Sequence, residues 1–267
     1  MAVYCLGSIN IDHFYRLAHL PAPGETLAAA ARTVGLGGKG ANQSVAAACA
    51  GAEVFHIGAI GADGCWVRDR IASYGIRTDF IAEVDGPTGH AIILVDPAGE
   101  NSIVILSGAN IRIGIDMVRT ALARSVSEDI LLIQNETNMQ VEAAEIAKKS
   151  GMKVIYSAAP FAADAVKAVL PHVDLLILND IEARQLATAT GKSVDALPVS
   201  QILVTHGSEG ATWRSNVTGE EIRRPAFPVK PVDTTAAGDV FCGYLAAAVD
   251  GAMPVKKALE LAAAAAA

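Results

Sequence analysis

The stretch Leu175-Leu-Ile-Leu-Asn-Asp-Ile-Glu-Ala-Arg-Gln-Leu-Ala-Thr188 places a short apolar run directly before a segment of helical length. A continuous run of Leu and Ile is typical of a strand buried on both faces of a parallel sheet. The residues from Asp180 to Thr188 then have the length expected of the helix that covers such a sheet. The stretch therefore predicts one strand–helix unit of a doubly wound α/β fold.

The same alternation of apolar runs and helical segments is repeated along the chain and indicates βαβ units. Strands are expected at residues 3–9, 54–60, 130–134, 154–157, 175–178 and 202–205. Helices are expected at residues 41–50, 65–74, 115–124, 141–149, 163–170, 180–188 and 239–249. No linker rich in Pro, Gly or Ser divides the chain, so we expect one domain with a mainly parallel sheet.

One region departs from this alternation. Apolar runs at residues 90–95 and 102–106 flank the turn-rich Asp96-Pro-Ala-Gly-Glu-Asn101, a pattern that predicts a β-hairpin. With the extended stretch 12–17, this hairpin is expected to form a small sheet. That sheet is either an edge of the main sheet or a lid that excludes water from a pocket.

Composition excludes several classes of protein. Of the 267 residues, 52% are hydrophobic, which excludes a disordered chain. Lys and Arg total 21 against 28 Asp and Glu, a net charge of −7, so neither nucleic acid nor an anionic membrane is an expected partner. The four scattered cysteines and the lack of a signal peptide or an apolar span favour a cytoplasmic protein.

The segment Gly35-Leu-Gly-Gly-Lys-Gly-Ala-Asn42 is the first of two that are rich in small residues. It fits G-x-G-x-x-G in form, but no buried strand precedes it, as a dinucleotide site requires. It is not a P-loop, because Lys39 is followed by Gly40 instead of Ser or Thr. Clustered glycines usually mark a turn, but Lys39 and Asn42 add polar groups where the backbone can approach a ligand closely. We therefore interpret the segment as a binding loop.

The second such segment, Asp233-Thr-Thr-Ala-Ala-Gly-Asp239, precedes an apolar helix. Small residues at Ala236, Ala237 and Gly238 leave backbone N–H groups at the start of this helix, where an anion is stabilised. A phosphoryl group in transfer is such an anion. Asp239, in the first helical turn, is then placed to accept a proton from an attacking hydroxyl. Alternatively, Asp239 only stabilises the helix dipole.

Together these two segments resemble the two signatures of the ribokinase-like carbohydrate kinases, also called the PfkB family. Four further segments stand in the order that the family shows: Gly7-Ser-Ile-Asn-Ile-Asp12, Pro23-Gly-Glu-Thr26, Gly108-Ala-Asn110 and Asn179-Asp-Ile-Glu-Ala183. The resemblance extends from Val3 to the last residue. It implies a three-layer α/β/α sandwich over residues 1–267, with a β-sheet lid at about residues 11–35 and 88–107.

The resemblance also implies roles for individual residues. Sugar hydroxyls would be bound by Asn10, Asp12, Gly38, Lys39, Asn42 and Glu136. Asn179 and Glu182 would organise Mg²⁺ and the phosphates, and the contact of Glu182 with the metal would be indirect. A nucleotide-binding turn would contain Thr205, Gly207 and Gly210. The anion hole would be formed by Ala236, Ala237 and Gly238, with Asp239 as general base, and a loop for a monovalent cation, usually K⁺, would contain Asp233 and Thr235.

Singly, several of these residues have ordinary structural explanations. Asn10 is a residue type that forms turns, Glu136 is placed to cap a nearby helix, and Glu182 fits an exposed helical position. Taken together, these residues favour a sugar site, because a sugar presents several hydroxyls and each needs a paired donor or acceptor.

Three features depart from the family pattern. Ser157 stands where these kinases often carry Asn, and the short, charged segment 212–224 leaves the base pocket hard to define. The sequence stops at Ala267, where family members continue. We therefore expect part of the cation loop and one wall of the adenine site to be missing, with weaker binding of nucleotide and K⁺.

The expected activity is ATP-dependent phosphorylation of the primary 5-hydroxyl of D-ribose or a ribose-like sugar. Two alternatives stay open: a kinase for another pentose, a ketohexose or a nucleoside, and a non-catalytic sugar-binding relative. Aromatic residues make up only 5% of the chain, which favours a free sugar over a base that must be stacked. The exposed edge of the lid favours a homodimer.

Overall fold

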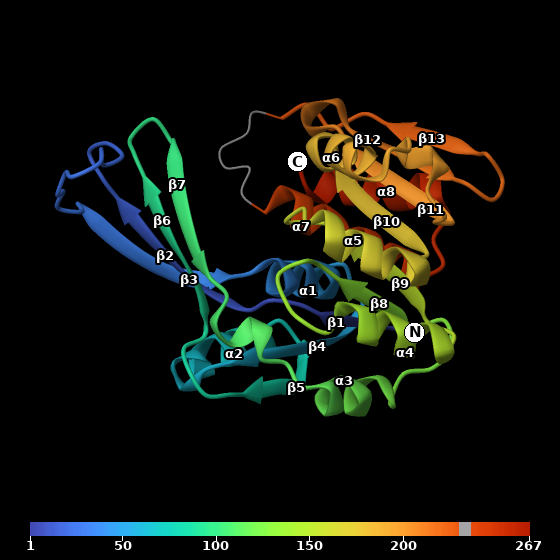
Figure 1. Cartoon of the computed structure of the whole chain (residues 1–267), viewed down its shortest axis with the longest axis horizontal. Coiled ribbons are helices and arrows are strands. Elements are labelled where there is room, and N and C mark those ends of the chain that lie inside the picture. Colours follow the sequence, from blue (N-terminus) through green and yellow to red (C-terminus); the bar gives the residue numbers. More distant parts are fainter. Residues whose placement is uncertain (230–235) are drawn as a thin grey trace.

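The computed structural model describes residues 1–229 and 236–267 (Figure 1). Among these residues the main sheet contains β1 (Ala2–Leu6), β4 (Glu53–Ile60), β5 (Arg77–Glu83), β8 (Ile130–Ile133), β9 (Lys153–Ser157), β10 (Leu175–Asn179), β11 (Gln201–Thr205), β12 (Ala211–Ser215) and β13 (Glu221–Arg224). Their order is β13-β12-β11-β10-β9-β8-β1-β4-β5. The strands from β11 to β5 in this order are parallel, whereas β12 and β13 pair in antiparallel fashion. The prediction of a mainly parallel central sheet is confirmed.

Helices cover both faces of this sheet (Figure 1). Side chains of β1 alternate between the faces, so Val3 and Cys5 lie in one apolar core and Tyr4 and Leu6 in the other. The first core is closed by α1 (Lys39–Cys49), α2 (Cys65–Ala72), α7 (Ala237–Asp250) and α8 (Val255–Ala265). The second is closed by α3 (Ile115–Leu122), α4 (Gln140–Lys149), α5 (Ala163–Val169) and α6 (Asp180–Thr190). The predicted three-layer sandwich is thus present, and no helix in the described part of the chain is long and apolar enough to cross a membrane.

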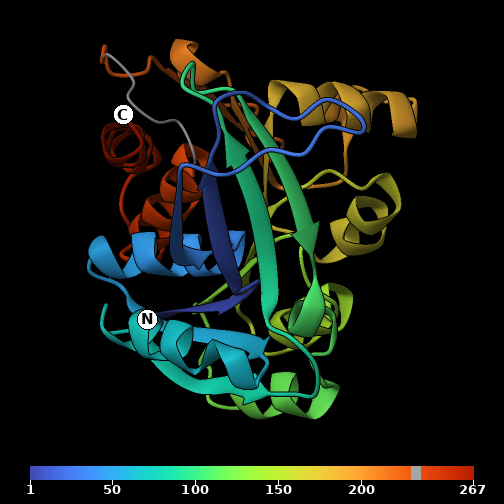
Figure 2. The ribbon, with the colours of Figure 1, turned by 90° about the vertical axis from the view of Figure 1, so that its left-hand side faces the viewer.

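A second, smaller sheet extends away from the main one (Figures 1 and 2). It contains β2 (Asn10–Arg16), β3 (Ala31–Gly37), β6 (Gly89–Val95) and β7 (Asn101–Leu106), in the order β3-β2-β6-β7. β2 pairs in parallel with β6 and in antiparallel fashion with β3, and β6 and β7 form a hairpin. Because these strands pair only with one another in the described residues, the alternative of an edge hairpin on the main sheet is wrong.

The structure differs from the sequence prediction at several strands. β1 ends at Leu6 instead of continuing to residue 9, because residues 7–9 cross from the main sheet to the second one. Gly7 permits this crossing, since a Cβ there would lie 2.4 Å from the Cα of Gly40. β3, β5, β12 and β13 were not expected as strands. Short 3-10 helices occur at Ala62–Gly64, Gly108–Ile111, Leu170–His172, Val194–Ala196 and Gly207–Glu209.

The order of the strands reverses between β1 and β8. The chain proceeds from β1 to β4 and β5 on one side, and from β8 to β9, β10 and β11 on the other. In doubly wound folds, ligands bind outside the carboxyl ends of the strands at such a switch point. Residues 7–9 follow β1 there and residues 134–136 follow β8. The second sheet rises from the same edge (Figure 2), so the switch point is where a binding site is expected.

Candidate active site

The start of α1 lies over the switch point and is capped by a distant carboxylate. Oε2 of Glu136 accepts a hydrogen bond from the backbone N–H of Lys39 at 3.0 Å, and another from the hydroxyl of Ser8. A carboxylate at a helix N-terminus is stabilised by the free N–H groups and the helix dipole. Glu136 was considered as a cap for a helix that starts nearby, but it caps α1 and not α4, which has no side-chain cap.

Tight backbone packing fixes the first small-residue segment. Gly38 adopts a φ of +91°, a conformation that other residues rarely adopt, directly before α1 begins. A Cβ on Gly40 would lie 2.4 Å from the backbone of Gly7. The close approach of α1 to the end of β1 therefore requires glycine at position 40. The segment is therefore a rigid junction between β1 and α1, not a flexible turn.

Asn10 and Asp12 lie on one face of β2, above this junction. Oδ1 of Asn10 accepts a hydrogen bond from the amide of Asn110 at 2.8 Å, so Asn10 begins a strand and does not form a turn. Oδ1 of Asp12 is buried without a hydrogen-bond partner among the described residues. Burial, helped by the nearby Glu136 carboxylate, raises the pKa of Asp12 to about 6. A buried acceptor of this kind fits a ligand hydroxyl.

Asp239 lies in the first turn of α7 and is 8% exposed. Nδ2 of Asn42 donates to its Oδ2 at 3.2 Å, and Nε2 of Gln43 donates to its Oδ1 at 3.0 Å. Burial raises the pKa of Asp239, while the charge of Lys39 and the two amide donors limit the rise. The two small-residue segments, which are far apart in the sequence, therefore meet in one site.

The start of α7 is suited to an anion. Ala236 precedes the helix with a φ of +62°, and the N–H groups of Ala237, Gly238 and Asp239 belong to the first turn, where a helix leaves its donors unpaired. A Cβ on Gly238 would meet no atom of the described residues within 4 Å, so no described side chain packs against this position of the first turn. Asp239 and these donors thus belong to the same helical turn.

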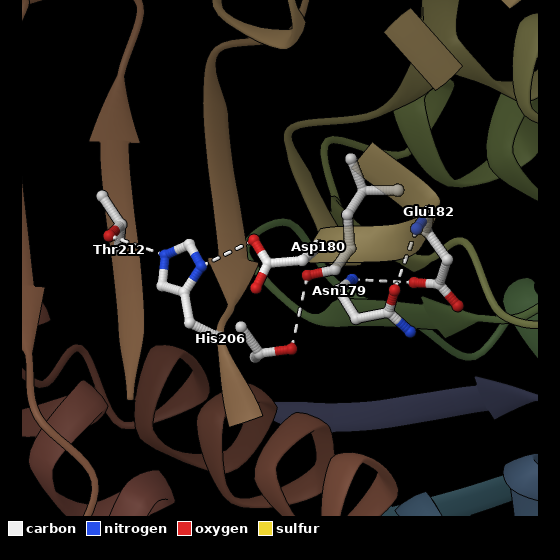
Figure 3. A network of polar contacts seen from close by, with 7 residues as sticks. Asn179, Asp180, Glu182, His206 and Thr212 are labelled. Atoms are coloured by element: carbon white, nitrogen blue, oxygen red, sulfur yellow. Dashed lines mark hydrogen bonds and ion pairs between the residues drawn. The ribbon is translucent and has the colours of Figure 1, made fainter. Parts of the chain in front are cut away.

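Between the end of β10 and the start of α6, Asn179 and Glu182 form a capping box (Figure 3). The Asn179 side chain accepts from the N–H of Glu182 at 2.9 Å, and the Glu182 side chain accepts from the N–H of Asn179 at 2.8 Å. Burial raises the pKa of Glu182, and the charge of Lys39 opposes the rise. Both residues thus have a structural role, and Glu182 is within electrostatic reach of the first segment.

The turn after β11 is held to α6 by a histidine (Figure 3). Nδ1 of His206 lies 2.8 Å from Oδ1 of Asp180, and its Nε2 lies 2.9 Å from the hydroxyl of Thr212 on β12. Thr205 precedes the turn and pairs with Asn179 in the parallel register of β10 and β11. Gly207 and Gly210 in this turn have φ angles of +56° and +104°. The candidate nucleotide residues on β10 and β11 are therefore neighbours.

Two predicted residues, Asp233 and Thr235, lie outside the described residues. Within residues 1–229 and 236–267, no group of three or more His, Cys, Asp or Glu side chains is placed to hold a metal ion. A cavity of about 630 Å³ lies beside the polar site and is bounded by β3 of the second sheet and by α1, α2 and α7. Of the predicted residues, Asn42 and Ala236 line this cavity.

Five polar residues of this region were not assigned a role from the sequence: Ser8, Gln43, Asn110, Gln134 and His206. Ser8 and Asn110 lie within segments that carry the family resemblance, Gln43 directly follows such a segment, and His206 lies within the candidate nucleotide turn. Gln134 is the polar residue that directly follows β8. A polar side chain that follows a buried parallel strand is a signal for a site residue.

Comparisons with known proteins agree with this geometry. A model of the pfkB family carbohydrate kinases matches residues 2–267. A ribokinase of Haemophilus influenzae is 38% identical over 253 residues, which cover 89% of this chain and 82% of that protein. A solved ribokinase of Thermotoga maritima matches with a TM-score of 0.89 at 32% identity, over 100% of this chain and 92% of that one. The solved ribokinase of Arabidopsis thaliana, complexed with ribose and ATP, matches with a TM-score of 0.84 at 29% identity, over 100% and 92%.

The family model and these relatives cover the main sheet, the second sheet and both small-residue segments. The chain therefore belongs to the pfkB carbohydrate kinase family and is a phosphotransferase that uses an alcohol group as its acceptor.

Proposed function

We propose that this protein transfers the γ-phosphate of ATP to the primary 5-hydroxyl of D-ribose or a ribose-like sugar. The observation that carries this proposal is the position of Asp239. Its buried carboxylate lies at the start of α7 and is held by Asn42, a residue of the proposed sugar site, and by Gln43, the next residue of α1. One group thus adjoins both the alcohol and the anion-binding N–H groups that the reaction requires.

In the proposed reaction Asp239 acts as general base. It accepts the proton of the 5-hydroxyl while the hydroxyl oxygen forms its bond to the γ-phosphorus and the bond from that phosphorus to the β–γ bridging oxygen breaks. The N–H groups of Ala237 and Gly238 stabilise the negative charge on the phosphoryl oxygens. A carboxylate whose pKa is raised by burial is a stronger base than an exposed one.

The sugar is proposed to lie between β2 and the start of α1. Asp12 has a buried oxygen without a partner among the described residues, which is available for one hydroxyl. The remaining donors and acceptors are Asn10, Lys39, Asn42 and Glu136. The glycine at position 37 lets the Asp12 carboxylate keep its place, because a Cβ on Gly37 would lie 2.0 Å from Oδ2 of Asp12. We propose that the second sheet acts as a lid that excludes water during transfer.

The nucleotide is proposed to lie along the carboxyl ends of β10 and β11, next to Thr205, Gly207 and Gly210. Mg²⁺ bound to the phosphates supplies charge neutralisation, and Glu182 is the described acidic residue placed to organise it indirectly. The sequence resemblance further supports activation by K⁺ through Asp233 and Thr235. We also propose a cytoplasmic location, which the four free cysteines and the need for ATP support.

The lid also supports a proposal of assembly. Every residue of β7 is exposed, and Ile103, Val104, Ile105 and Leu106 form an apolar edge strand. Exposed apolar edges are usually covered by another chain. We propose that two copies of the chain form a dimer in which each covers the β7 edge of the other. Sedimentation analysis tests this proposal: the protein should be a dimer, and its V104K variant should be a monomer.

The activity is tested by ADP release with MgATP, K⁺ and a panel of D-ribose, 2-deoxy-D-ribose, D-fructose and adenosine. D-Ribose should be the best acceptor, and 5-O-methyl-D-ribose should be inactive because its 5-hydroxyl is blocked. Asp239→Asn should lower kcat by a factor on the order of 100 to 10,000 while calorimetric binding of D-ribose is retained.

The matched control is Asp250→Asn, which changes another buried Asp of α7 at the opposite end of the helix. It should keep the activity of the wild type. A preference for adenosine or fructose would replace the proposed substrate. Ribose binding without turnover in the wild type would favour the non-catalytic alternative.

A further inference from the structure

Two buried glutamines connect the carboxylate of Asp239 to the end of β8. Gln43 on α1 and Gln134 after β8 both have an exposed fraction of 0%. Nε2 of Gln134 donates to Oε1 of Gln43 at 2.7 Å, and Nε2 of Gln43 donates to Oδ1 of Asp239 at 3.0 Å. The hydrogen bonds therefore run in one direction, from Gln134 through Gln43 to the carboxylate.

The direction of this chain is determined by its two ends. An amide has one acceptor end and one donor end, whereas an ionised carboxylate only accepts. If the amide of Gln43 were reversed, its oxygen would face Oδ1 of Asp239 and its NH₂ group would face the NH₂ group of Gln134. Because Gln134 donates to Gln43, the donor end of Gln43 has to point at Asp239.

Gln134 keeps this orientation although one of its own atoms has no partner. Its Oε1 is buried without a hydrogen bond to any described residue and faces Gly7, where a Cβ would lie 2.4 Å away. An unpaired buried acceptor is unfavourable. The donor end of Gln134 keeps its place because it faces two acceptors, Oε1 of Gln43 at 2.7 Å and Sγ of Cys5 at 3.6 Å, of which the amide oxygen is the stronger.

The two oxygens of Asp239 thus have different surroundings. Oδ1 is bound to the fully buried Gln43, whereas Oδ2 is bound to Asn42, a residue of the proposed sugar site that lines the adjoining cavity. We propose that Gln43 and Gln134 are positioning residues that hold Oδ1, so that Oδ2 faces the acceptor hydroxyl and takes its proton. This inference rests on the proposed function of Asp239 as general base.

The chain of hydrogen bonds from Gln134 through Gln43 to Asp239 is called the relay here. It is expected to act on the chemical step and not on sugar binding, since neither glutamine belongs to the proposed sugar site. The donor of Gln43 also stabilises the ionised form of Asp239. Its loss should therefore raise the pH at which kcat declines on the acid side. A merely structural role would not move that limb of the pH profile.

The experiment compares Gln43→Met and Gln134→Met, which keep the approximate volume of the side chain and remove its hydrogen bonds. Both variants should lower kcat by about tenfold or more, with the calorimetric Kd for D-ribose unchanged and the acid limb of the kcat profile moved to higher pH. The double variant should lose no more than Gln43→Met alone, because the two residues act as one chain.

The matched control is Gln201→Met, which removes a glutamine that accepts from Trp213 far from the site. It should leave kcat and the pH profile unchanged. If Gln43→Met does not fold, the double variant takes its place, because it leaves neither glutamine amide without a partner. Its kcat, Kd for D-ribose and pH profile are then compared with those of the wild type.

Failure of the relay and failure of the proposed base are distinguishable. If Asp239→Asn abolishes turnover but both glutamine variants retain the kcat and pH profile of the wild type, the relay is wrong and the base assignment stands. If Asp239→Asn retains the kcat of the wild type, the assignment of Asp239 as general base is wrong, and the relay that rests on it is wrong too. Losses of kcat that match losses of ribose affinity, or that add in the double variant, would also contradict the relay.

Discussion

Nδ2 of Asn42 lies 3.2 Å from Oδ2 of Asp239, although 197 positions of the chain separate the two residues. The contact exists because α1 and α7 pack side by side on the same face of the sheet. It couples a residue of the proposed sugar site directly to the proposed base. Changes in the first small-residue segment are therefore expected to affect the chemical step as well as binding.

The first prediction concerns the pH dependence of sugar binding. Burial raises the pKa of Asp12 from 3.8 to about 6, so its carboxylate becomes protonated as the pH falls below about 6. A protonated carboxyl accepts hydroxyls poorly, and KM for D-ribose should rise below that pH. Asp12→Asn should weaken ribose binding at pH 7 and remove this dependence, as measured by calorimetry from pH 5 to 8.

The same group makes an opposite contribution to the stability of the free protein. Because the pKa of Asp12 is higher in the folded state, its contribution to stability is greatest below about pH 4 and is lost as the pH rises through about 6. Asp12→Asn should therefore unfold at a higher temperature than the wild type at pH 7, without ligand. An unchanged or lower Tm together with unchanged ribose affinity would contradict the role given to Asp12.

The second prediction uses two glycines of β3. A Cβ on Gly37 would lie 2.0 Å from Oδ2 of Asp12, whereas a Cβ on Gly35 would meet no described atom within 4 Å. Gly37→Ala should fold, because the carboxylate can rotate away, but the displaced Asp12 should raise KM for D-ribose by about tenfold or more. Gly35→Ala is the matched control and should bind ribose as the wild type does. Equal KM values for the two variants would exclude the proposed position of the sugar.

These predictions also show what the sequence alone could provide. The apolar runs that became β1, β8, β9, β10 and β11 are buried on both faces, so their composition was sufficient to predict the parallel sheet. β3, β12 and β13 carry polar or exposed residues, because each lies at or near a sheet edge. Their pattern contains too little apolar alternation to predict a strand.

The site was predictable to a different extent. The two small-residue segments indicated which residues to consider, because small residues before a helix leave N–H groups free for an anion. The contacts among them were not predictable. Glu136 caps α1, and Gln134 reaches Asp239 through Gln43, only because β8 lies next to β1 in the sheet. The order of strands is a long-range property that the residues of one segment do not contain.

The third prediction separates the structural and catalytic roles of Glu182. Its side chain accepts from the N–H of Asn179, and Gln can form the same bond without a negative charge. Glu182→Gln should therefore keep the Tm of the wild type but raise KM for MgATP or lower kcat several-fold. Asn179→Ala should instead lower the stability by about 1 kcal/mol, since it removes the cap. Thermal unfolding and steady-state kinetics of both variants distinguish the roles, and wild-type kinetics in Glu182→Gln would leave the capping box as its function.

The last prediction concerns His206, which joins the start of α6 to β12 beside the proposed nucleotide turn (Figure 3). His206→Asn can retain the contact with Asp180, and His206→Gln can retain the contact with Thr212. Each variant loses one hydrogen bond, worth about 1 kcal/mol, and should raise KM for ATP several-fold while KM for D-ribose is unchanged.

Thr212→Val is the matched control for this prediction, because it removes only the contact at Nε2 of His206. Its KM for ATP should match that of His206→Asn, and the combination of the two changes should add nothing further, since both remove the same bond. Steady-state kinetics with each substrate varied in turn provides the test. An equal rise in both KM values would mean that His206 supports the fold in general and not the nucleotide turn.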